Sequence, residues 1–205
     1  MIKITFHNNN KEYDKAIIDL IDTRSTILDL GCGTGELLKE LIKKKEVMGR
    51  GIDIDQGKLI ESIRNGISVS KGDIDKGLPE YRDQTYDYVL LSSTLQVLRH
   101  PSFVIDEMLR VGKKAVVRIP NSAYWRARTQ FFFKGINPKT DLFPYEWYNT
   151  PNIHSLTIKD FRIFCKERNI IILKEIFLVN SKKIGRIKQK LSNFYAEEGI
   201  FLITQ

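Results

Sequence analysis

The chain has 205 residues, of which 42% are hydrophobic and 28% are charged, a composition typical of a globular protein and unlike that of a disordered one. Its two cysteines, Cys32 and Cys165, exclude a disulfide framework and favour reduced thiols. No stretch reaches the roughly 18 apolar residues of a membrane span. The N-terminus has no apolar run long enough for a secretory signal, so we expect a cytoplasmic protein.

The net charge of +8 would suit an acidic partner such as RNA. Most lysines are scattered among glutamates and aspartates, however, which favours an ordinary solvated surface. Residues 181–190, "SKKIGRIKQK", contain five basic residues and no acid. They also contain no aromatic residue to stack on a base, so a solvated loop or a protein docking patch is favoured over nucleic-acid binding. Histidines and cysteines show no metal-ligand spacing, and we expect no metal.

Helices and strands alternate along the first two thirds of the chain. Apolar residues at helical spacing predict helices over residues 12–21, 36–45, 56–66 and 101–112, and short apolar runs predict strands over residues 26–30, 47–55, 67–70, 86–92 and 114–120. Thr157 opens a further helix, with Asp160 completing a capping-box pattern. Strands over residues 170–180 and 199–205 follow. The order predicts an α/β, doubly wound, Rossmann-like sheet that is mostly parallel, with the last two strands antiparallel to each other.

The stretch "ILDLGCGTGE" joins the first strand to the next helix. Backbone N–H groups at such a helix N-terminus can face a ligand, and glycine lets the ligand approach closely. No lysine followed by Ser or Thr stands where a nucleoside-triphosphate loop needs it. In the dinucleotide fingerprint Glu36 would replace the third glycine, and its carboxylate would repel a pyrophosphate. The spacing of Gly31, Gly33 and Gly35 therefore favours a cationic or zwitterionic adenosine compound.

Three carboxylates follow the strands in order. Asp29 precedes the glycine loop and is expected to hold an amino group. Asp53 ends the second strand about 20 residues beyond the glycines, where an acid takes ribose hydroxyls. Asp73 follows the third strand, where it can meet the exocyclic amine of adenine, with Ile54 and Ile74 on either side of the base. The expected cofactor-binding residues are Asp29, Gly31, Cys32, Gly33, Gly35, Asp53, Ile54, Asp73, Ile74 and Ser92.

The segments "LDLGCGTGE", "GIDID" and "GDID" resemble motifs of the class I methyltransferases that depend on S-adenosylmethionine (SAM). This resemblance implies a seven-stranded sheet with an antiparallel last strand, and binding of SAM or of its product S-adenosylhomocysteine. A more specific resemblance covers nearly the whole chain. "LLSSTLQVLRHPSFVIDEMLRVGKKAVVRIPN", "WRAR", "PYEWYNTPNIHSLTIKDF" and "AEEGIFLI" are similar to the methionine biosynthesis protein MetW family. It implies a role in methionine synthesis beside a homoserine O-acyltransferase, without specifying a methyl acceptor.

Catalysis is less clearly marked than cofactor binding. Methyl transfer from a sulfonium depends mainly on positioning, and a base is needed only if the nucleophile carries a proton. Ser92, Ser93 and Thr94 stand where amino-methylating enzymes of one type carry a [DN]-P-P-[FYW] signature, which argues against that chemistry. The weak catalytic candidates are His154 and Tyr124, in an aromatic-rich insertion at about residues 122–155. "NSAYWRAR" departs from the family there, with Ala123 and Tyr124 where glycine and histidine are usual.

The aromatic-rich insertion has three interpretations: an acceptor pocket, a lid over the cofactor, or a surface that docks another protein. Three functions remain open with it. The chain is a SAM-binding accessory protein of an acyltransferase, a small-molecule methyltransferase, or, least favoured, an RNA methyltransferase. In each case we expect one SAM-binding domain over residues 1–205.

Overall fold

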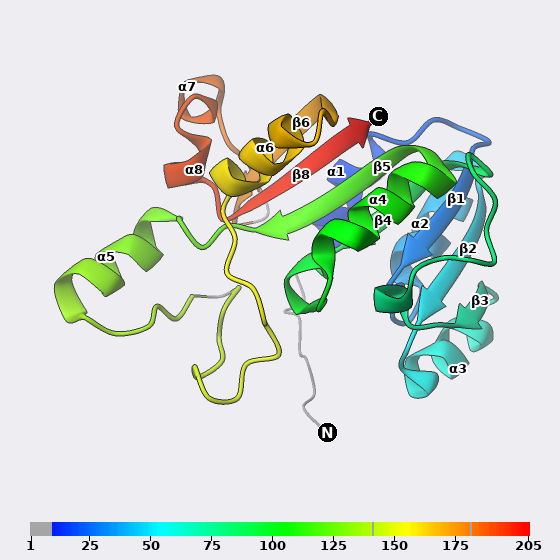
Figure 1. Ribbon diagram of the computed structural model, residues 1–205, viewed down its shortest axis with the longest axis horizontal. Coiled ribbons are helices and arrows are strands. Elements are labelled where there is room, and N and C mark those ends of the chain that lie inside the picture. The colour runs from blue at the N-terminus through cyan, green and yellow to red at the C-terminus, as the bar shows by residue number, and fades with distance from the viewer. Residues whose placement is uncertain (1–9, 141, 181) are drawn as a thin grey trace.

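The computed structural model describes residues 10–140, 142–180 and 182–205 (Figure 1). The helices are α1 (Asn10–Ile18), α2 (Glu36–Lys45), α3 (Gln56–Arg64), α4 (Pro101–Val111), α5 (Trp125–Lys134), α6 (Ile158–Glu167), α7 (Arg186–Gln189) and α8 (Ser192–Tyr195), with 3-10 turns η1 (Ile74–Lys76) and η2 (Leu95–Val97). The strands are β1 (Thr26–Leu30), β2 (Met48–Asp53), β3 (Ser68–Lys71), β4 (Tyr86–Ser92), β5 (Gly112–Pro120), β6 (Ile171–Val179), β7 (Lys182–Lys183) and β8 (Glu198–Thr204).

In the described part of the chain, eight strands form one sheet in the order β3-β2-β1-β4-β5-β8-β6-β7. Strands β1 to β5 pair with one another in parallel, whereas β8 runs antiparallel to both β5 and β6. The predicted doubly wound sheet and the antiparallel pairing of the last two long strands are confirmed. The two-residue β7, which pairs with the end of β6, makes the eighth strand and has no signal in the sequence.

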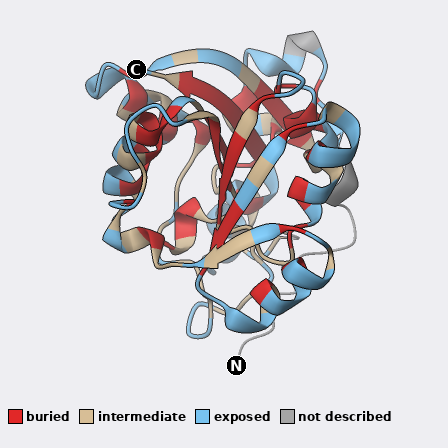
Figure 2. Ribbon diagram, turned by 90° about the vertical axis from the view of Figure 1, so that its right-hand side faces the viewer, coloured by how far each residue is buried: buried red, intermediate tan, exposed pale blue. Residues whose placement is uncertain are grey.

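The central strands are buried on both faces because helices cover each side (Figures 1 and 2). Successive side chains of a strand point to opposite faces. In β4, Val89 and Leu91 pack toward α4 and α6, whereas Tyr88 and Leu90 pack toward α1 and α2. Two apolar cores therefore enclose the sheet, and the unbroken apolar run of β4 reflects burial on both sides. No helix in the described residues is long and apolar enough to cross a membrane.

Most predicted elements match the structure to within a few residues, and the capping box at the start of α6 is present. The Thr157 hydroxyl accepts the Asp160 N–H, and the Asp160 carboxylate accepts the Thr157 N–H at 3.0 Å. Helix α5 and the two short helices α7 and α8 were not predicted. Helix α5 begins directly after Tyr124, inside the aromatic-rich insertion, and ends at Gly135 in the left-handed conformation typical of a helix C-terminus.

A buried ion pair joins β5 to β8. Arg118 Nε lies 2.5 Å from Glu198 Oε2, and Arg118 Nη2 lies 3.0 Å from Glu198 Oε1. The guanidinium also lies over the Tyr13 ring of α1, 4.0 Å from its centroid. Two buried charges require each other, because removing one leaves the other without compensation in a medium of low polarity.

We predict that Glu198→Leu lowers the free energy of unfolding by about 3–5 kcal/mol, because it leaves the Arg118 cation buried without its carboxylate. The double variant Arg118→Met/Glu198→Leu should be more stable than Glu198→Leu alone, since it removes both charges. Urea denaturation followed by circular dichroism measures both values. A double variant less stable than the single one would contradict this account of the pair.

Candidate functional site

A cavity of about 730 Å³ opens at the carboxyl ends of β1, β2 and β4. This is the edge at which open α/β sheets bind ligands. Its lining combines the glycine loop, the strand-end acids and the segment after β4. The lining residues are Asp14, Asp29, Gly31, Cys32, Gly33, Thr34, Glu36, Leu37, Asp53, Ile54, Asp55, Lys58, Gly72, Asp73, Ile74, Asp75, Ser92, Ser93, Thr94, Val97, Leu98 and Arg118.

The glycine loop is shaped by two backbone constraints. Gly31, Gly33 and Gly35 all have positive φ, a conformation that strains residues with a Cβ. A Cβ on Gly31 would also lie 2.7 Å from the Thr94 hydroxyl oxygen, whereas a Cβ on Gly33 would meet no atom within 4 Å. Gly31 is therefore required by packing within the protein, and Gly33 faces open space.

The Asp53 carboxylate ties the glycine loop to the end of β2. Its Oδ2 accepts the Gly33 N–H at 2.8 Å, and its Oδ1 accepts the Asp55 N–H at 2.9 Å. A carboxylate has about four acceptor positions, so two remain for a ligand. Asp53 thus both holds the glycine loop in place and provides a hydrogen-bond acceptor in the cavity wall.

Asp29 is a buried carboxyl at the base of the cavity. Burial, with the nearby charges of Asp14 and Asp53, raises the pKa of Asp29 to about 8. Burial also raises the pKa of Asp14 to about 6, although the Arg118 guanidinium opposes this shift. These carboxyl groups would ionise more readily beside a cationic group, because an opposite charge favours the ionised form.

The far wall carries groups suited to a flat apolar ring. Ile74 is buried while Ile54 is exposed, and both line the cavity. Asp73 accepts the Asp75 N–H at 3.2 Å through Oδ1, and its Oδ2 lies 3.7 Å from the exposed Lys76 ammonium. Asp75 is structurally committed, since it accepts the backbone N–H groups of Arg99 and His100.

Cys32 in the glycine loop is not a nucleophile in this setting. Burial and the charges of Asp29 and Asp53 raise the pKa of its thiol to about 12. The neutral thiol packs beneath Gly51, where a Cβ would lie 2.5 Å from the Cys32 sulfur. A cysteine needs its thiolate to react, so Cys32 contributes shape rather than chemistry.

Nine of the ten expected cofactor-binding residues line this cavity. The tenth residue and the two catalytic candidates lie elsewhere. Gly35 does not line it and packs instead toward α3, where a Cβ would lie 3.0 Å from the Ser62 hydroxyl. Tyr124 is buried outside the lining, and burial raises the pKa of its hydroxyl. His154 lies in a different cavity. Neither catalytic candidate therefore reaches the strand-end cavity.

Sequence reasoning missed the part of the site built from distant elements. Asp14 comes from the polar side of α1, and periodicity alone gives no reason to place it at the ends of the strands. The sequence could have identified Arg118 as part of the site, because it is a lone cation in the otherwise apolar run "AVVRIP". A charge inside a buried strand needs a partner, and that requirement indicates a polar cluster.

Two solved structures share this fold at low sequence identity. A SAM-dependent methyltransferase from Archaeoglobus fulgidus matches with a TM-score of 0.68 and 16% identity, covering 95% of this chain and 92% of that one. A SAM-dependent methyltransferase from Aquifex aeolicus matches with a TM-score of 0.63 and 14% identity, covering 98% and 95%.

Sequence comparison is more specific. The family model of the methionine biosynthesis protein MetW matches residues 11–203. The bifunctional methionine biosynthesis protein MetXA/MetW of Rhodopirellula baltica is 35% identical over 173 residues. The match covers 80% of this chain but 28% of that relative, so the chain spans less than a third of its length.

The sheet order and the glycine loop at its ligand-binding edge define a protein with the class I methyltransferase fold. Within that class, the chain belongs to the MetW family of methionine biosynthesis proteins.

The two glycines of the loop should respond differently to alanine. Both substitutions strain the backbone at positive φ, but only Gly31→Ala forces a methyl group against Thr94. We predict that Gly31→Ala is less stable than Gly33→Ala by about 1–3 kcal/mol, the usual cost of overpacking. Urea denaturation of the two variants measures the difference, and equal stabilities would contradict the packing described for Gly31.

Proposed function

We propose that the strand-end cavity binds SAM or S-adenosylhomocysteine. Asp29 and the Gly31–Gly35 loop would hold the amino-acid end, with Gly35 acting by packing the loop rather than by contact. Asp53 would accept hydrogen bonds from the ribose hydroxyls. Asp73 would meet the adenine amine, with the base between Ile54 and Ile74. Cys32 and Ser92 would form part of the cavity wall.

The charge of the cavity supports a cationic ligand. Its lining holds the seven carboxyl groups of Asp14, Asp29, Glu36, Asp53, Asp55, Asp73 and Asp75 against the two cations of Lys58 and Arg118. Arg118 also pairs with Glu198, so it offsets these acids only in part. A pyrophosphate would meet strong repulsion here, whereas the ammonium and sulfonium of SAM would be attracted.

We predict that SAM affinity rises between pH 6 and pH 7.5. With a pKa of about 8, Asp29 is protonated in the empty protein at these pH values, and it must ionise to pair with the ligand's ammonium. Binding therefore releases protons, and affinity should rise by up to about tenfold per pH unit for each proton released. The window lies below the ordinary α-amino pKa of about 7.7–8.0, so most of the ligand keeps its ammonium charge.

Calorimetry in buffers of different ionisation enthalpy counts the protons released. Asp29→Asn should bind SAM more weakly and lose its share of the pH dependence. NAD is the negative control. A flat pH profile for the native chain would contradict the role given to Asp29, and tight NAD binding without a response to SAM would overturn the cofactor assignment.

We further propose that this protein acts with a homoserine O-acyltransferase of methionine synthesis. One relative carries both names, MetXA and MetW, in a single bifunctional protein, which supports a functional association of the two parts. Since SAM is made from methionine, an accessory protein that binds SAM could connect acyltransferase activity to the supply of the end product.

A direct link between the cofactor cavity and the insertion supports this role. The backbone N–H groups of Ile153 and His154 both donate to the Gln96 carbonyl, at 2.9 and 3.1 Å. Gln96 belongs to η2, whose neighbours Thr94 and Val97 line the cofactor cavity. A ligand that shifts η2 would therefore shift the insertion, which is the physical requirement for coupling two sites.

The alternative function is a SAM-dependent methyltransferase acting on a small molecule. It requires an acceptor beside the sulfonium, and the described residues of the 122–155 insertion do not line the cofactor cavity. This geometry favours the accessory role.

We predict that the homoserine O-acyltransferase from the same genome co-purifies with this protein and changes rate when it binds. Adding SAM should alter that rate, and Asp53→Ala should abolish the SAM response by removing the ribose acceptor. An acyltransferase that neither binds nor changes rate would rule out the accessory role. Methyl transfer to a small molecule in the same mixture would support the alternative.

A further inference from the structure

Helix α5 and the described chain that returns from it, residues 125–140 and 142–155, form an arm that projects from the sheet (Figure 1). Large aromatic side chains on this arm are exposed to solvent. The exposed fractions are 65% for Phe131, 81% for Phe132, 78% for Phe133, 73% for Trp147 and 69% for Tyr148. Phe132 and Phe133 contact each other, as do Trp147 and Tyr148. Single exposed apolar residues are ordinary, but two such groups of rings on one arm mark an interaction surface.

The arm has a defined shape rather than that of a loose loop. The Gln130 side-chain amide donates to the Lys139 carbonyl at 2.7 Å and accepts the Lys139 N–H at 3.0 Å. Lys139 also forms an ion pair with Glu146. At the base, Arg128 donates to the Ala123 carbonyl at 2.6 Å and lies over the Phe194 ring of α8. A surface held in place before binding loses less entropy when a partner docks.

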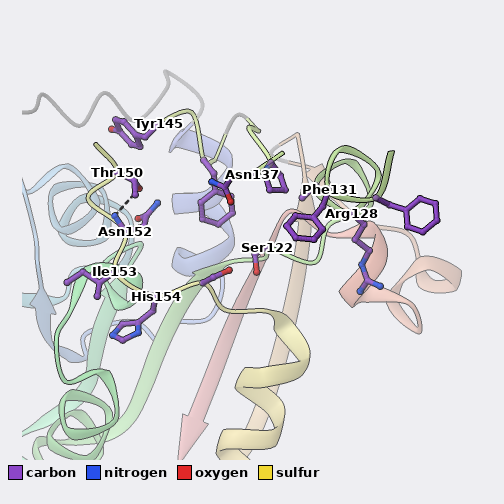
Figure 3. Close-up of a pocket in the computed structure, with 14 residues that line it drawn as sticks. Ser122, Arg128, Phe131, Asn137, Tyr145, Thr150, Asn152, Ile153 and His154 are labelled. Atoms are coloured by element: carbon purple, nitrogen blue, oxygen red, sulfur yellow. Dashed lines mark hydrogen bonds between the residues drawn. The ribbon is translucent and has the colours of Figure 1, made fainter. Parts of the chain in front are cut away.

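A cavity of about 610 Å³ lies between α5 and the returning chain. Phe131 forms part of one side, and Tyr145, Ile153 and His154 come from the other (Figure 3). Its described lining contains no carboxyl group, in contrast to the acidic cofactor cavity. His154 Nε2 is buried and has no hydrogen-bond partner among the described atoms. The cavity can therefore receive an apolar side chain that carries a polar end.

The charge of α5 specifies the surrounding surface of the partner. The helix "WRARTQFFFK" carries Arg126, Arg128 and Lys134 and no acidic residue. Arg128 is committed to the base of the arm, which leaves Arg126 and Lys134 for an acidic partner. Tryptophan, tyrosine and arginine are the residue types that contribute most to binding at interfaces.

The arrangement of the aromatic residues argues against a membrane as the partner. Phe131, Phe132 and Phe133 are consecutive, so they point in directions about 100° apart around the helix. A flat bilayer surface suits a single apolar stripe and would leave at least one of these rings outside. A second copy of the chain is also disfavoured, because a symmetric contact through α5 would bring together two helices that carry basic and no acidic residues. A concave protein surface can enclose all three rings.

We propose that the arm is the docking surface for the homoserine O-acyltransferase, through an acidic, concave region that also inserts an apolar side chain into the 610 Å³ cavity. This proposal rests on the partnership proposed above. It assigns α5, rather than the basic 181–190 segment, to the interface.

Binding of the acyltransferase to purified variants tests the arm. Phe132→Ala removes the most exposed ring, and Arg126→Glu reverses the charge of an exposed cation that lies over the Trp125 ring. Each should weaken binding by at least about tenfold, the loss typical of an interface anchor. Arg126→Glu should also reduce the dependence of affinity on salt. The Phe132 and Arg126 side chains are solvent-exposed, as are the Ile63 and Lys43 side chains of the two controls described next. The fold and the SAM affinity of all four variants should therefore be unchanged.

The matched controls are Ile63→Ala, which truncates an exposed apolar side chain on α3, and Lys43→Glu, which makes the same charge change on α2. Both should bind the acyltransferase within about twofold of the native chain. If the native chain binds and the arm variants bind equally well, the arm is not the interface although the partnership stands. If the native chain does not bind at all, both proposals fail.

Two further measurements address the other partners. Co-sedimentation with phosphatidylserine-containing vesicles tests a membrane, and light scattering of the chain alone tests a second copy. An interaction of either kind that Phe132→Ala abolishes would overturn the assignment to the acyltransferase.

Discussion

The Arg118 guanidinium makes the interaction that links the strand-end cavity to the closing of the sheet. It lies where α1, β5 and β8 meet, pairs with Glu198, and faces the Asp14 side of the cavity. One buried cation thus serves the pairing of two strands and partly offsets a group of acids. The remaining excess of carboxyl groups gives the cavity its preference for positive charge, because desolvated carboxylates gain most from a cationic ligand.

Two regions with opposite chemistry lie on either side of η2. The cofactor cavity is acidic, and the arm is basic and aromatic. Their separation explains why an insertion after β5 need not be a lid: its described residues line a cavity of their own and bond to η2 through the backbone N–H groups of Ile153 and His154. An arrangement of this kind suits transmission between a ligand and a partner better than chemistry at a shared centre.

The sequence predicts the half of the site that local rules control. Asp53 and Asp73 were expected at the ligand-binding edge because parallel strands place their carboxyl ends together, and the structure places both in the cavity wall. Asp14 and Glu198 were not expected, because their roles arise only when α1 and β8 pack beside Arg118. Periodicity identifies which side of a helix is buried, but it does not indicate which distant charge that helix will meet.

Helix α5 shows a second limit of sequence patterns. Its apolar residues include three adjacent phenylalanines rather than a stripe with a repeat of 3.6 residues, so the pattern that marked α2 and α4 is missing. The three adjacent phenylalanines that kept the helix from being predicted also indicate its role. Rings spread around a helix cannot all be buried by the body of the protein. Gly135 was the one local signal, a left-handed cap that stops the helix.

The position of β8 has a consequence for how the chain acquires its structure. β8 follows β6 in the chain but separates it from β5 in the sheet, with antiparallel ladders on both sides. During synthesis β6 emerges first and has no place beside β5 until residues 198–204 arrive. The facing edge of β5 must therefore wait unpaired while the arm, α6 and β6 are made, and the edges of both strands wait while α7 and α8 follow. Late strand insertion of this kind slows folding and prolongs the period in which chaperones or neighbouring chains can capture the open edge.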